Sequence, residues 1–443
     1  MIRILILGAG RSAYHVIAYL LDQSKHQHWQ IRIADQHFSP QTLALKERYT
    51  AEWIQVDLNS ETEWNAIFSN VHLVISLLPP NWHIKVAQTA VSEGIHMSTA
   101  SYTSDEMRKL EPEILKKELL FLNECGLDPG IDHASAMDII SGLQAQGHTI
   151  DAFYSYCGGL PSHNTKTDSW AYKFSWNPRN VIIAGQSHAR FLEFRNESVI
   201  PYLQIFKRAE VISINGQEYD AYANRDSISY IETYGLNGIQ HFKRGTLRRK
   251  GYCKAWDIFV SLGLTDDTLL LNIAEPLSFA NLIRKFLPPV SISIEKAMLQ
   301  HSGHVLDTEL EAYLIDLHFN DFICQPQQAT PAQLLQQLLE QRWKLQPEDA
   351  DLVVMCHIIK YQRADGLRFK RISTFELEGN SAIDTAMSKT VGLPLAIAVT
   401  AFLNGQLPLS GLQIPTHPLL RDVILKGLKL QGLAFEETDE PLN

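Results

Sequence analysis

The stretch IRILILGAGRSA, residues 2–13, decides the fold class of this 443-residue chain. A strand-like apolar run leads directly into a GxGxxA turn, and a helical pattern follows from Tyr14 to Asp22. This order of strand, glycine turn and helix is typical of dinucleotide-binding folds, in which the helix N-terminus offers free N–H groups to a pyrophosphate. The first glycine allows the tight turn, the second lets the backbone approach the phosphates, and the small last residue lets the helix pack on the sheet. The expected cofactor-binding residues of this turn are Gly8, Gly10, Arg11, Ser12 and Ala13.

An acidic residue downstream strengthens this interpretation. Asp35 ends the second expected strand, residues 31–35, at the distance from the glycine turn where a carboxylate binds the adenosine ribose hydroxyls. A carboxylate there repels a 2′-phosphate, so we expect NAD as the cofactor. The neighbouring side chains of Arg11, Arg32 and His37 keep NADP open.

Strand-like and helical segments alternate through the first 130 residues. Further apolar runs cover residues 53–57 and 72–79, and two more begin at Gly94 and Glu118. Parallel strands need a helical crossover between them, so this alternation predicts a parallel sheet covered by helices on both faces.

Later strand ends supply further candidates for the cofactor site. Asp57 ends the third expected strand and either approaches the adenine or starts a helix without touching a ligand. Ser76, Leu77 and Leu78 close the fourth expected strand, at the crevice where open α/β sheets bind their ligands.

Past residue 130 the pattern changes. A helix is followed by an expected strand, Thr149–Cys157, and then by a run of expected loops up to about Tyr252. Residues 254–344 are mostly helical in pattern, and Ala364-Asp365-Gly366 predicts the turn of a β-hairpin. A last helical run, near residues 381–404, is apolar enough to be buried. The pattern therefore divides the chain into an α/β part up to about residue 130, a part with fewer helical signals, and a mainly helical part, 254–344.

Composition excludes several classes of protein. The 39 Lys and Arg residues against 49 Asp and Glu residues give a net charge of −10, which disfavours nucleic acid as a partner. Five cysteines without a CxxC pair indicate a reducing compartment, so we expect a cytoplasmic protein. The longest apolar run, Leu393–Leu403, is too short to span a bilayer, and no membrane partner is expected. The 17 histidines form no HExxH motif, so we expect no metal site, and neither GxSxG nor a P-loop occurs.

Five glycine-dense or polar clusters carry a resemblance to a known family. They are Gly126–His133, Ser155–Pro161, Tyr172–Trp176, Asn224–Asp226 and Arg244–Arg248. Together with Leu77-Leu78-Pro79 and Thr99-Ala100-Ser101-Tyr102 they resemble the glutamate-forming saccharopine dehydrogenases (saccharopine reductases) of lysine metabolism, in order and spacing over essentially the whole chain. One departure lies in Gly158–Asn164, which reads GGLPSHN where that family usually reads GGLPAPE.

The resemblance implies an oxidoreductase that acts on the secondary amine of saccharopine with NAD(P). Oxidation gives an imine, which water splits into glutamate and 2-aminoadipate 6-semialdehyde, and the reaction is reversible. It also implies three domains: a Rossmann domain (1–130, with a C-terminal return of about 381–443), an α/β substrate and dimerisation domain (131–253 and 346–380), and a small, mainly helical domain (254–345). The dimer contacts of the second domain imply a homodimer.

Expected substrate contacts follow from the same resemblance and from charge. Saccharopine carries three carboxylates, and arginine binds a carboxylate through two parallel hydrogen bonds. Arg225 and Arg248 lie in loop-like segments where they could converge on a cleft, although a lone arginine is ordinarily a surface residue. By the resemblance Ser101, Asp128, Thr246 and Leu247 also line the substrate, while Leu127, Gly130 and Trp176 approach the nicotinamide.

Three residues are candidates for proton transfer. Asp128, expected directly after the sixth strand, is the first candidate, and its alternative role is to cap the helix after Pro129. Tyr102 could relay a proton or merely pack, and Cys157 could be no more than a small buried residue.

Two other functions compete with saccharopine oxidation. A carboxynorspermidine dehydrogenase would perform a related reductive condensation on a diamine, but diamines need acidic pockets rather than Arg225 and Arg248. A catalytically silent NAD(P)-binding regulator would keep the glycine turn, but it has no need of Asp128 and the two arginines.

Overall fold

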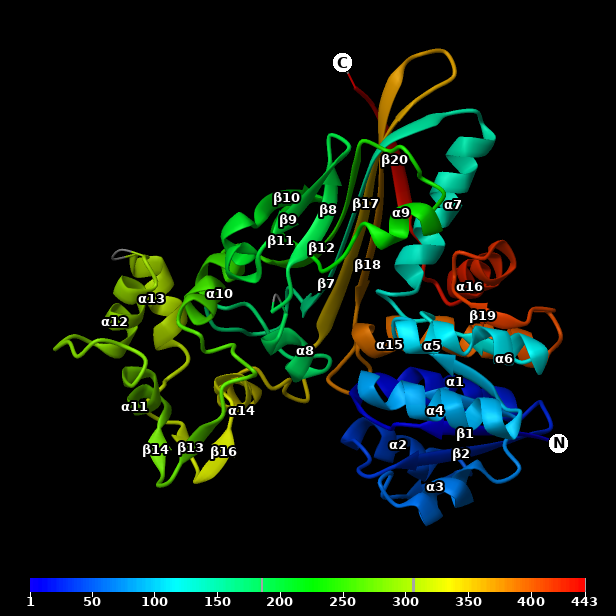
Figure 1. The fold of residues 1–443 in the computed structure, drawn as a ribbon, viewed down its shortest axis with the longest axis horizontal. Helices are drawn as coiled ribbons and strands as arrows, with labels where there is room; N and C mark the ends of the chain where they lie inside the picture. Colours follow the sequence, from blue (N-terminus) through cyan, green and yellow to red (C-terminus); the bar gives the residue numbers. More distant parts are fainter. Residues whose placement is uncertain (185, 305–306, 443) are drawn as a thin grey trace. The chain divides into compact units, whose positions relative to one another are not determined.

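Residues 1–184, 186–304 and 307–442 are described in a computed structural model of the chain (Figure 1). They form two compact units. Unit 1 contains residues 1–149 and 375–436, and unit 2 contains residues 150–374 together with the segment from 437 onward. The division into three domains with the boundaries given above stays a prediction.

Unit 1 is built on a parallel sheet with the strand order β19-β6-β5-β4-β1-β2-β3. Strand β1 lies between β4 and β2, and its residues Ile4–Leu7 are buried because helices cover both sides of a parallel sheet, which explains the apolar run before the glycine turn. The predicted Rossmann-type sheet is confirmed. The strands are β1 (Ile2–Leu7), β2 (Trp29–Asp35), β3 (Glu52–Gln55), β4 (Leu73–Ser76), β5 (His96–Thr99), β6 (Leu120–Leu122) and β19 (Gly411–Gln413).

The helices of unit 1 begin where the sequence provides caps. Ser39, Ser60 and Ser104 each accept a hydrogen bond from a main-chain N–H in the first turn of the helix that follows. The helical segments are η1 (Arg11–Ala13), α1 (Tyr14–Ser24), α2 (Pro40–Arg48), α3 (Glu61–Phe68), α4 (Pro80–Glu93), α5 (Asp105–Lys109), α6 (Glu111–Lys116), α7 (Ile131–Ala145), α15 (Ala386–Leu403) and α16 (Pro418–Leu430).

The last helical run returns to unit 1 as α15, which contacts α1, η1 and α16 (Figure 1). By length and composition alone α15 could cross a membrane, but 78% of it is buried inside the structure, and core helices pass the same test. Its N-terminal end supports the glycine turn, because the Ser388 hydroxyl donates to the carbonyl of Ser12 and accepts from the N–H of His15. The prediction of a buried helix near residues 381–404 is confirmed.

Unit 2 contains a mixed sheet with the central order β10-β11-β12-β7-β17-β18-β20, and β8 and β9 extend it from β12. The expected loops before Tyr252 are therefore largely wrong, because that stretch contains five strands. The sheet consists of β7 (Thr149–Pro161), β8 (Ala189–Glu193), β9 (Asn196–Ile200), β10 (Glu210–Ile214), β11 (Gln217–Ala223), β12 (His241–Arg249), β17 (Asp351–Gln362), β18 (Arg368–Glu378) and β20 (Glu436–Leu442).

Glycines in β7 and β12 explain why β7 was predicted too short and β12 was missed. A Cβ on Gly158 of β7 would lie 2.7 Å from the Cβ of Leu247, and one on Gly245 of β12 would lie 2.8 Å from the ring of Tyr156. The two glycines let side chains of the neighbouring parallel strand pass close to the backbone. A glycine-dense cluster thus marks a crowded strand here rather than a loop.

The remainder of unit 2 is mainly helical, as predicted, with two short hairpins. Its core is aromatic: Trp170, Trp256 and Trp343 are fully buried and pack on one another. The elements are α8 (Pro178–Ile182), η2 (Tyr202–Gln204), η3 (Phe206–Arg208), α9 (Ser229–Thr233), α10 (Tyr252–Ser261), α11 (Phe279–Arg284), α12 (Ile294–His301), α13 (Thr308–Ile315), α14 (Pro331–Arg342), β13 (Leu271–Ile273) with β16 (Gln327–Ala329), and β14 (Leu277–Ser278) with β15 (Ile323–Cys324).

The predicted hairpin around Asp365 is confirmed. β17 and β18 are neighbours in the sheet, and the N–H of Arg363 donates to the carbonyl of Leu367 across the turn. Gly366 has φ of +87°, a conformation that glycine adopts without strain, which explains the Asp-Gly signal.

The contact between α15 and α1 leaves no room for a side chain at Gly392. A Cβ there would lie 2.6 Å from the backbone nitrogen of Val16, so we expect Gly392→Ala to lower the free energy of unfolding by about 2 kcal/mol. Gly142→Ala in α7 is the matched control, because nothing lies within 4 Å of its Cβ, and it should stabilise the helix by about 0.5–1 kcal/mol. Chemical denaturation measures both, and equal effects of the two substitutions would contradict the close contact.

Candidate active site

The glycine turn after β1 has two glycines with different roles. Gly8 has φ of +100°, and a Cβ on it would lie 2.8 Å from the carbonyl carbon of Leu77 at the end of β4. Gly10 has φ of −74°, and nothing lies within 4 Å of its Cβ position. Gly8 is therefore required by the chain itself, whereas the backbone at Gly10 faces open space. Ala13, as predicted, is buried.

Asp35 is committed in part to the glycine turn. Its carboxylate accepts hydrogen bonds from the N–H of Ala9 at 2.5 Å and from the N–H of His37 at 3.1 Å. It therefore holds the turn in place and keeps further lone pairs with which it can accept from ribose hydroxyls.

The cations near Asp35 differ in how far they are engaged. Arg32 is paired with Glu52 at 2.9 Å and donates to the carbonyl of Ile67, so it is engaged elsewhere. Arg11 is exposed and, within the described ranges, has no ion pair or hydrogen bond. An open face at Gly10, a free cation at Arg11 and the carboxylate of Asp35 fit a dinucleotide.

Asp57 lies two residues beyond the end of β3, not at its end. Its Oδ1 accepts hydrogen bonds from the N–H and the side-chain amide of Asn59 and from the amide of Gln36. The hydrogen bonds from Asn59 lower the pKa of this exposed carboxyl. Asp57 thus forms a local turn, and contact with the adenine stays a prediction.

The end of β4 is tied to the segment after β5 by a histidine that sequence reasoning missed. Ser76 is fully buried and its hydroxyl lies 2.8 Å from Nδ1 of His83, whose Nε2 lies 2.8 Å from the hydroxyl of Ser101. Leu77 donates its N–H to the carbonyl of Leu7, and Leu78 is buried. A histidine at the first turn of α4, directly after a strand end, is the signal that could have revealed this link.

A tight turn presents Asp128. Gly126 donates its N–H to the carbonyl of Pro129 and accepts from the N–H of Ile131, and Leu127 is buried. Gly130 has φ of +146°, and a Cβ on it would overlap the backbone of Gly126. The turn begins beyond β6, which ends at Leu122, so Asp128 does not follow the strand directly.

The structure brings Asp128 and Tyr102 together. The Tyr102 hydroxyl donates to Oδ1 of Asp128 at 2.7 Å, and both side chains are accessible. A phenol bonded to a carboxylate is an arrangement that can pass a proton to or from a substrate. The two candidates for proton transfer in unit 1 therefore form one pair.

A buried ion pair supports this region. Oε2 of Glu124 lies 2.9 Å from Nε2 of His133, both side chains are at most 1% exposed, and the N–H of Thr103 donates to Oε1. Burial alone would raise the pKa of Glu124, but the hydrogen bond and charge of His133 hold it below its usual value. The sequence analysis missed this pair, because a glutamate and a histidine nine residues apart form no recognisable motif.

In unit 2, Arg248 lies on β12 and not in a loop, which corrects the prediction. It is 2% exposed, and its guanidinium lies 5.2–5.8 Å from the ring centres of Tyr172, Tyr222 and Tyr252. It donates to the carbonyl of Leu247 at 3.0 Å and to the Tyr222 hydroxyl at 3.4 Å, while its Nε has no partner. No carboxylate among the described residues pairs with it. A buried cation without a counterion is costly, so Arg248 is poised to receive an anion.

Two of the rings around Arg248, those of Tyr222 and Tyr252, are neutral phenols at pH 7. Burial raises the pKa of Tyr222 and raises that of Tyr252 well above its usual value. The attraction that remains is that of a cation for aromatic faces, which leaves the guanidinium charge available to a ligand.

The pairing of β12 with its neighbouring strands places two other candidates, Thr246 and Cys157, on the same face of the sheet as Arg248. Thr246 is paired with Cys157 of β7 and with Tyr222 of β11, and side chains at paired positions share a face. Leu247 points to the opposite face, where it packs with Tyr156 and Leu160. The structure therefore groups Cys157, Thr246 and Arg248 and leaves only the backbone of Leu247 near them.

Arg225 and Trp176 lie in connecting segments of unit 2. Arg225 follows β11 with φ of +30°, is exposed, and has no side-chain partner in the part of the chain that the structure describes. Trp176 packs against the aromatic core, and its buried Nε1 has no hydrogen-bond partner. Both keep polar groups free for a ligand.

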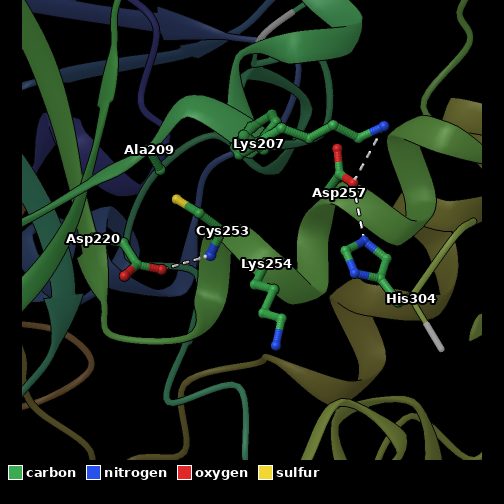
Figure 2. Close-up of a pocket in the computed structure, with 8 residues that line it drawn as sticks. Lys207, Ala209, Asp220, Cys253, Lys254, Asp257 and His304 are labelled. Carbon is green, nitrogen blue, oxygen red and sulfur yellow. Dashed lines mark hydrogen bonds and ion pairs between the residues drawn. The ribbon is translucent and has the colours of Figure 1, made fainter. Parts of the chain in front are cut away.

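A cavity of about 260 Å³ in unit 2 lies beside α10, and no predicted site residue lines it. Figure 2 shows Asp257 between Lys207 and His304, with Asp220 facing the main-chain N–H of Cys253. Nε2 of His304 lies 3.0 Å from Oδ2 of Asp257, and Asp220 accepts from the N–H of Cys253 at 2.9 Å. The charges around this cavity largely pair with one another. Among the described residues no group of three or more His, Cys, Asp or Glu could hold a metal ion.

Fold and site together define a class: a Rossmann-type dinucleotide-binding protein with a second α/β unit that carries a buried, unpaired arginine. Two family models match the chain. Residues 4–122 match the saccharopine dehydrogenase NADP binding domain, and residues 126–433 match the saccharopine dehydrogenase C-terminal domain. The chain belongs to the saccharopine dehydrogenase family.

Curated relatives agree with this assignment. The chain is 29% identical over 394 residues to saccharopine dehydrogenase [NADP(+), L-glutamate-forming] of Saccharomyces cerevisiae, which covers 87% of this chain and 88% of the yeast protein. It is 29% identical over 447 residues to the mitochondrial alpha-aminoadipic semialdehyde synthase of Mus musculus, but it spans only 47% of that longer protein.

A solved structure agrees over the full length. The apo, histidine-tagged saccharopine dehydrogenase (L-Glu forming) of Saccharomyces cerevisiae matches 99% of this chain and 100% of its own with a TM-score of 0.87 at 28% identity. The resemblance inferred from the sequence motifs is confirmed.

The two glycines of the turn should respond differently to substitution. Gly10→Leu should leave the free energy of unfolding unchanged within about 0.5 kcal/mol, because its backbone suits any residue, but weaken binding of NADP+ at least about tenfold by filling the open space. Gly8→Ala should instead lower the free energy of unfolding by about 2–3 kcal/mol. Calorimetric titration and denaturation separate the two effects. Unweakened binding by Gly10→Leu would show that the nucleotide lies elsewhere.

Proposed function

We propose that this chain oxidises saccharopine to L-glutamate and 2-aminoadipate 6-semialdehyde with NADP+, and catalyses the reverse condensation as well. The observation that carries the proposal is Arg248, a buried guanidinium with no carboxylate partner among the described residues. The names of the yeast protein and of the matching family models support the substrate and the cofactor.

The reaction balances with water as the second reactant. The secondary amine of saccharopine loses a hydride from its lysine-side carbon and a proton, which gives an imine. Water adds to the imine carbon, and cleavage of the C–N bond releases glutamate and the semialdehyde. Bound NADP+ supplies the hydride acceptor, and the residues proposed to hold it are Gly8, Gly10, Arg11, Ser12, Ala13, Asp35, Ser76, Leu77, Leu78, Leu127, Gly130 and Trp176.

Charge assigns the substrate contacts. We infer that Arg248 and the exposed Arg225 each hold a carboxylate, with Thr246 donating a hydroxyl hydrogen bond beside Arg248. The neutral phenols around Arg248 do not compete for its charge. A diamine would bring an ammonium to this cation, so the geometry disfavours the carboxynorspermidine-type reaction.

Proton transfer is assigned to the pair of Tyr102 and Asp128. The carboxylate takes the proton of the amine or of the attacking water, and the phenol bonded to it at 2.7 Å extends the path by one group. Cys157 is buried beside Thr246, on the face of the sheet that carries Arg248 and that we propose to bind the substrate. An intact proton-transfer pair disfavours a silent regulator.

The cofactor assignment to NADP rests on Arg11. From the sequence we expected NAD because of Asp35 and left NADP open. In the structure the carboxylate of Asp35 accepts hydrogen bonds from the N–H groups of Ala9 and His37, while Arg11 at the same turn has no partner among the described residues. A free guanidinium is a suitable partner for a 2′-phosphate.

Assembly as a homodimer and a cytoplasmic location stay predictions. All five cysteines are buried, and none of them forms a disulfide among the described residues, which suits a reducing compartment. Light scattering of the purified chain tests the dimer.

Substitution of Arg248 tests the substrate. Arg248→Met should raise the KM for saccharopine about 100-fold, because a charge-assisted contact to a carboxylate is lost, while the KM for NADP+ stays within about twofold. It should not lower the melting temperature, because an unpaired buried charge is replaced by an apolar chain of similar length. Lys250→Ala, which removes an exposed cation paired with Glu218, is the control and should leave both KM values unchanged. Absorbance at 340 nm follows the reaction, and no turnover of saccharopine by the unsubstituted protein would refute the function.

Substitution of Arg11 tests the cofactor. Arg11→Ala should lower kcat/KM for NADP+ by about 10-fold or more and change that for NAD+ by less than about threefold. Lys25→Ala, whose ammonium pairs with Asp22 at the far end of α1, serves as the control. An unchanged ratio of the two efficiencies would remove Arg11 from the 2′-phosphate site.

A further inference from the structure

His83 on α4 joins the ends of two neighbouring strands. Its Nδ1 lies 2.8 Å from the hydroxyl of Ser76 at the end of β4, and its Nε2 lies 2.8 Å from the hydroxyl of Ser101 just beyond β5. His83 is 6% exposed. All three residues lie in unit 1. One buried ring therefore connects Ser76, which we expect near the cofactor, with Ser101, which we expect to contact the substrate.

The ring is neutral at physiological pH. Burial lowers the pKa of His83 to about 4, and no carboxylate contacts it among the described residues. A neutral imidazole carries one N–H and one lone pair, so it donates to one serine and accepts from the other. Two arrangements are therefore possible: Ser76 donates to His83 and His83 donates to Ser101, or both hydrogen bonds run the other way.

Ser76 decides which direction this is. Its hydroxyl is completely buried, and within the described ranges Nδ1 of His83 is the one acceptor in hydrogen-bond contact with it. A buried hydroxyl proton without an acceptor is costly, so Ser76 donates to Nδ1. The N–H then lies on Nε2 and donates to Ser101.

The consequence for Ser101 is a fixed polarity. Its oxygen accepts from His83, and its main-chain N–H donates to the hydroxyl of Thr99 at 3.2 Å, so both its backbone and its side chain are held. The hydroxyl proton of Ser101 remains free to donate. A hydroxyl held in this way is a donor, which suits a carboxylate and not an ammonium.

We propose that His83 is a positioning residue, which acts through Ser101 and fixes its hydroxyl as a hydrogen-bond donor to a carboxylate of the substrate. This inference rests on the proposed function for the identity of that carboxylate. The direction of the hydrogen bonds follows from unit 1 alone and can be tested without turnover.

The first test is a double-mutant cycle. His83→Leu should raise the KM for saccharopine about 10-fold, as should Ser101→Ala, with the KM for NADP+ within about twofold in each case. In the Ser101→Ala background, His83→Leu should have no further effect on the KM for saccharopine, because its route to the substrate is gone. Factors that multiply in the double variant, or equal losses for saccharopine and NADP+, would overturn the proposal.

Two controls separate positioning from folding. His83→Gln keeps an amide N–H that can reach Ser101, and it should recover most of the affinity for saccharopine. His96→Leu removes another histidine of unit 1, whose Nδ1 accepts from the main-chain N–H of Leu120, and it should change the melting temperature but not the KM for saccharopine. Failure of His83→Gln to recover any affinity would count against a role through Ser101.

The second test reads the tautomer directly. In protein labelled with ¹⁵N at histidine, the resonances of His83 near pH 7 should show a protonated Nε2 and an unprotonated Nδ1, and Ser76→Ala should alter them. A proton on Nδ1 would overturn the inference. This outcome is independent of catalysis, so a protein that shows the expected tautomer but does not turn over saccharopine would refute the proposed function and leave the hydrogen-bond direction standing.

Discussion

The absence of a side chain at Gly8 is the constraint on which the cofactor half of the molecule depends. The backbone of β1 passes so close to Leu77 at the end of β4 that a Cβ would overlap the carbonyl group, and φ is positive at the same residue. This close approach brings the start of η1, the carboxylate of Asp35 and the end of β4 to one edge of the sheet. Asp35 then fixes the turn through the N–H of Ala9. The turn thus forms before any ligand arrives, which reduces the entropy that binding must overcome.

Unit 2 depends on the opposite kind of device, a charge left without a counterion. Folding removes Arg248 from water, and the three tyrosine rings with two oxygen acceptors offset only part of the cost. A protein that needed the residue for stability alone would gain from a carboxylate partner or an apolar replacement. Retention of the bare cation is understandable when an anionic ligand completes the pair, because stability is then exchanged for binding.

The sequence predicted those parts of the fold whose signals are local. The run into Gly8 and the Asp365-Gly366 turn each depend on a few adjacent residues, and the structure agrees with them. The end of β7 and the whole of β12 were missed because their signals are not local: Gly158 and Gly245 look like loop residues until the strand beside them is known. Burial of Arg248 could not be predicted either, since its surroundings are Tyr172, Tyr222 and Tyr252, which are far apart in the sequence. His83 reaches Ser101 only because β4 and β5 are neighbours in the sheet, and the turn after β6 brings Glu124 to His133, nine residues later.

The segment after β5 shows why these missed groups matter for function. Three successive residues are held by three different partners: the hydroxyl of Ser101 by His83, the phenol of Tyr102 by Asp128, and the N–H of Thr103 by Glu124. The segment has no regular secondary structure, so it lacks the hydrogen bonds that hold a strand or helix in place. Side chains supply them instead, and two of these partners, His83 and Glu124, are buried where water does not compete. A site assembled on a loop gains the precision of a rigid element in this way, because each reacting or binding group is oriented by a partner that is itself fixed by burial.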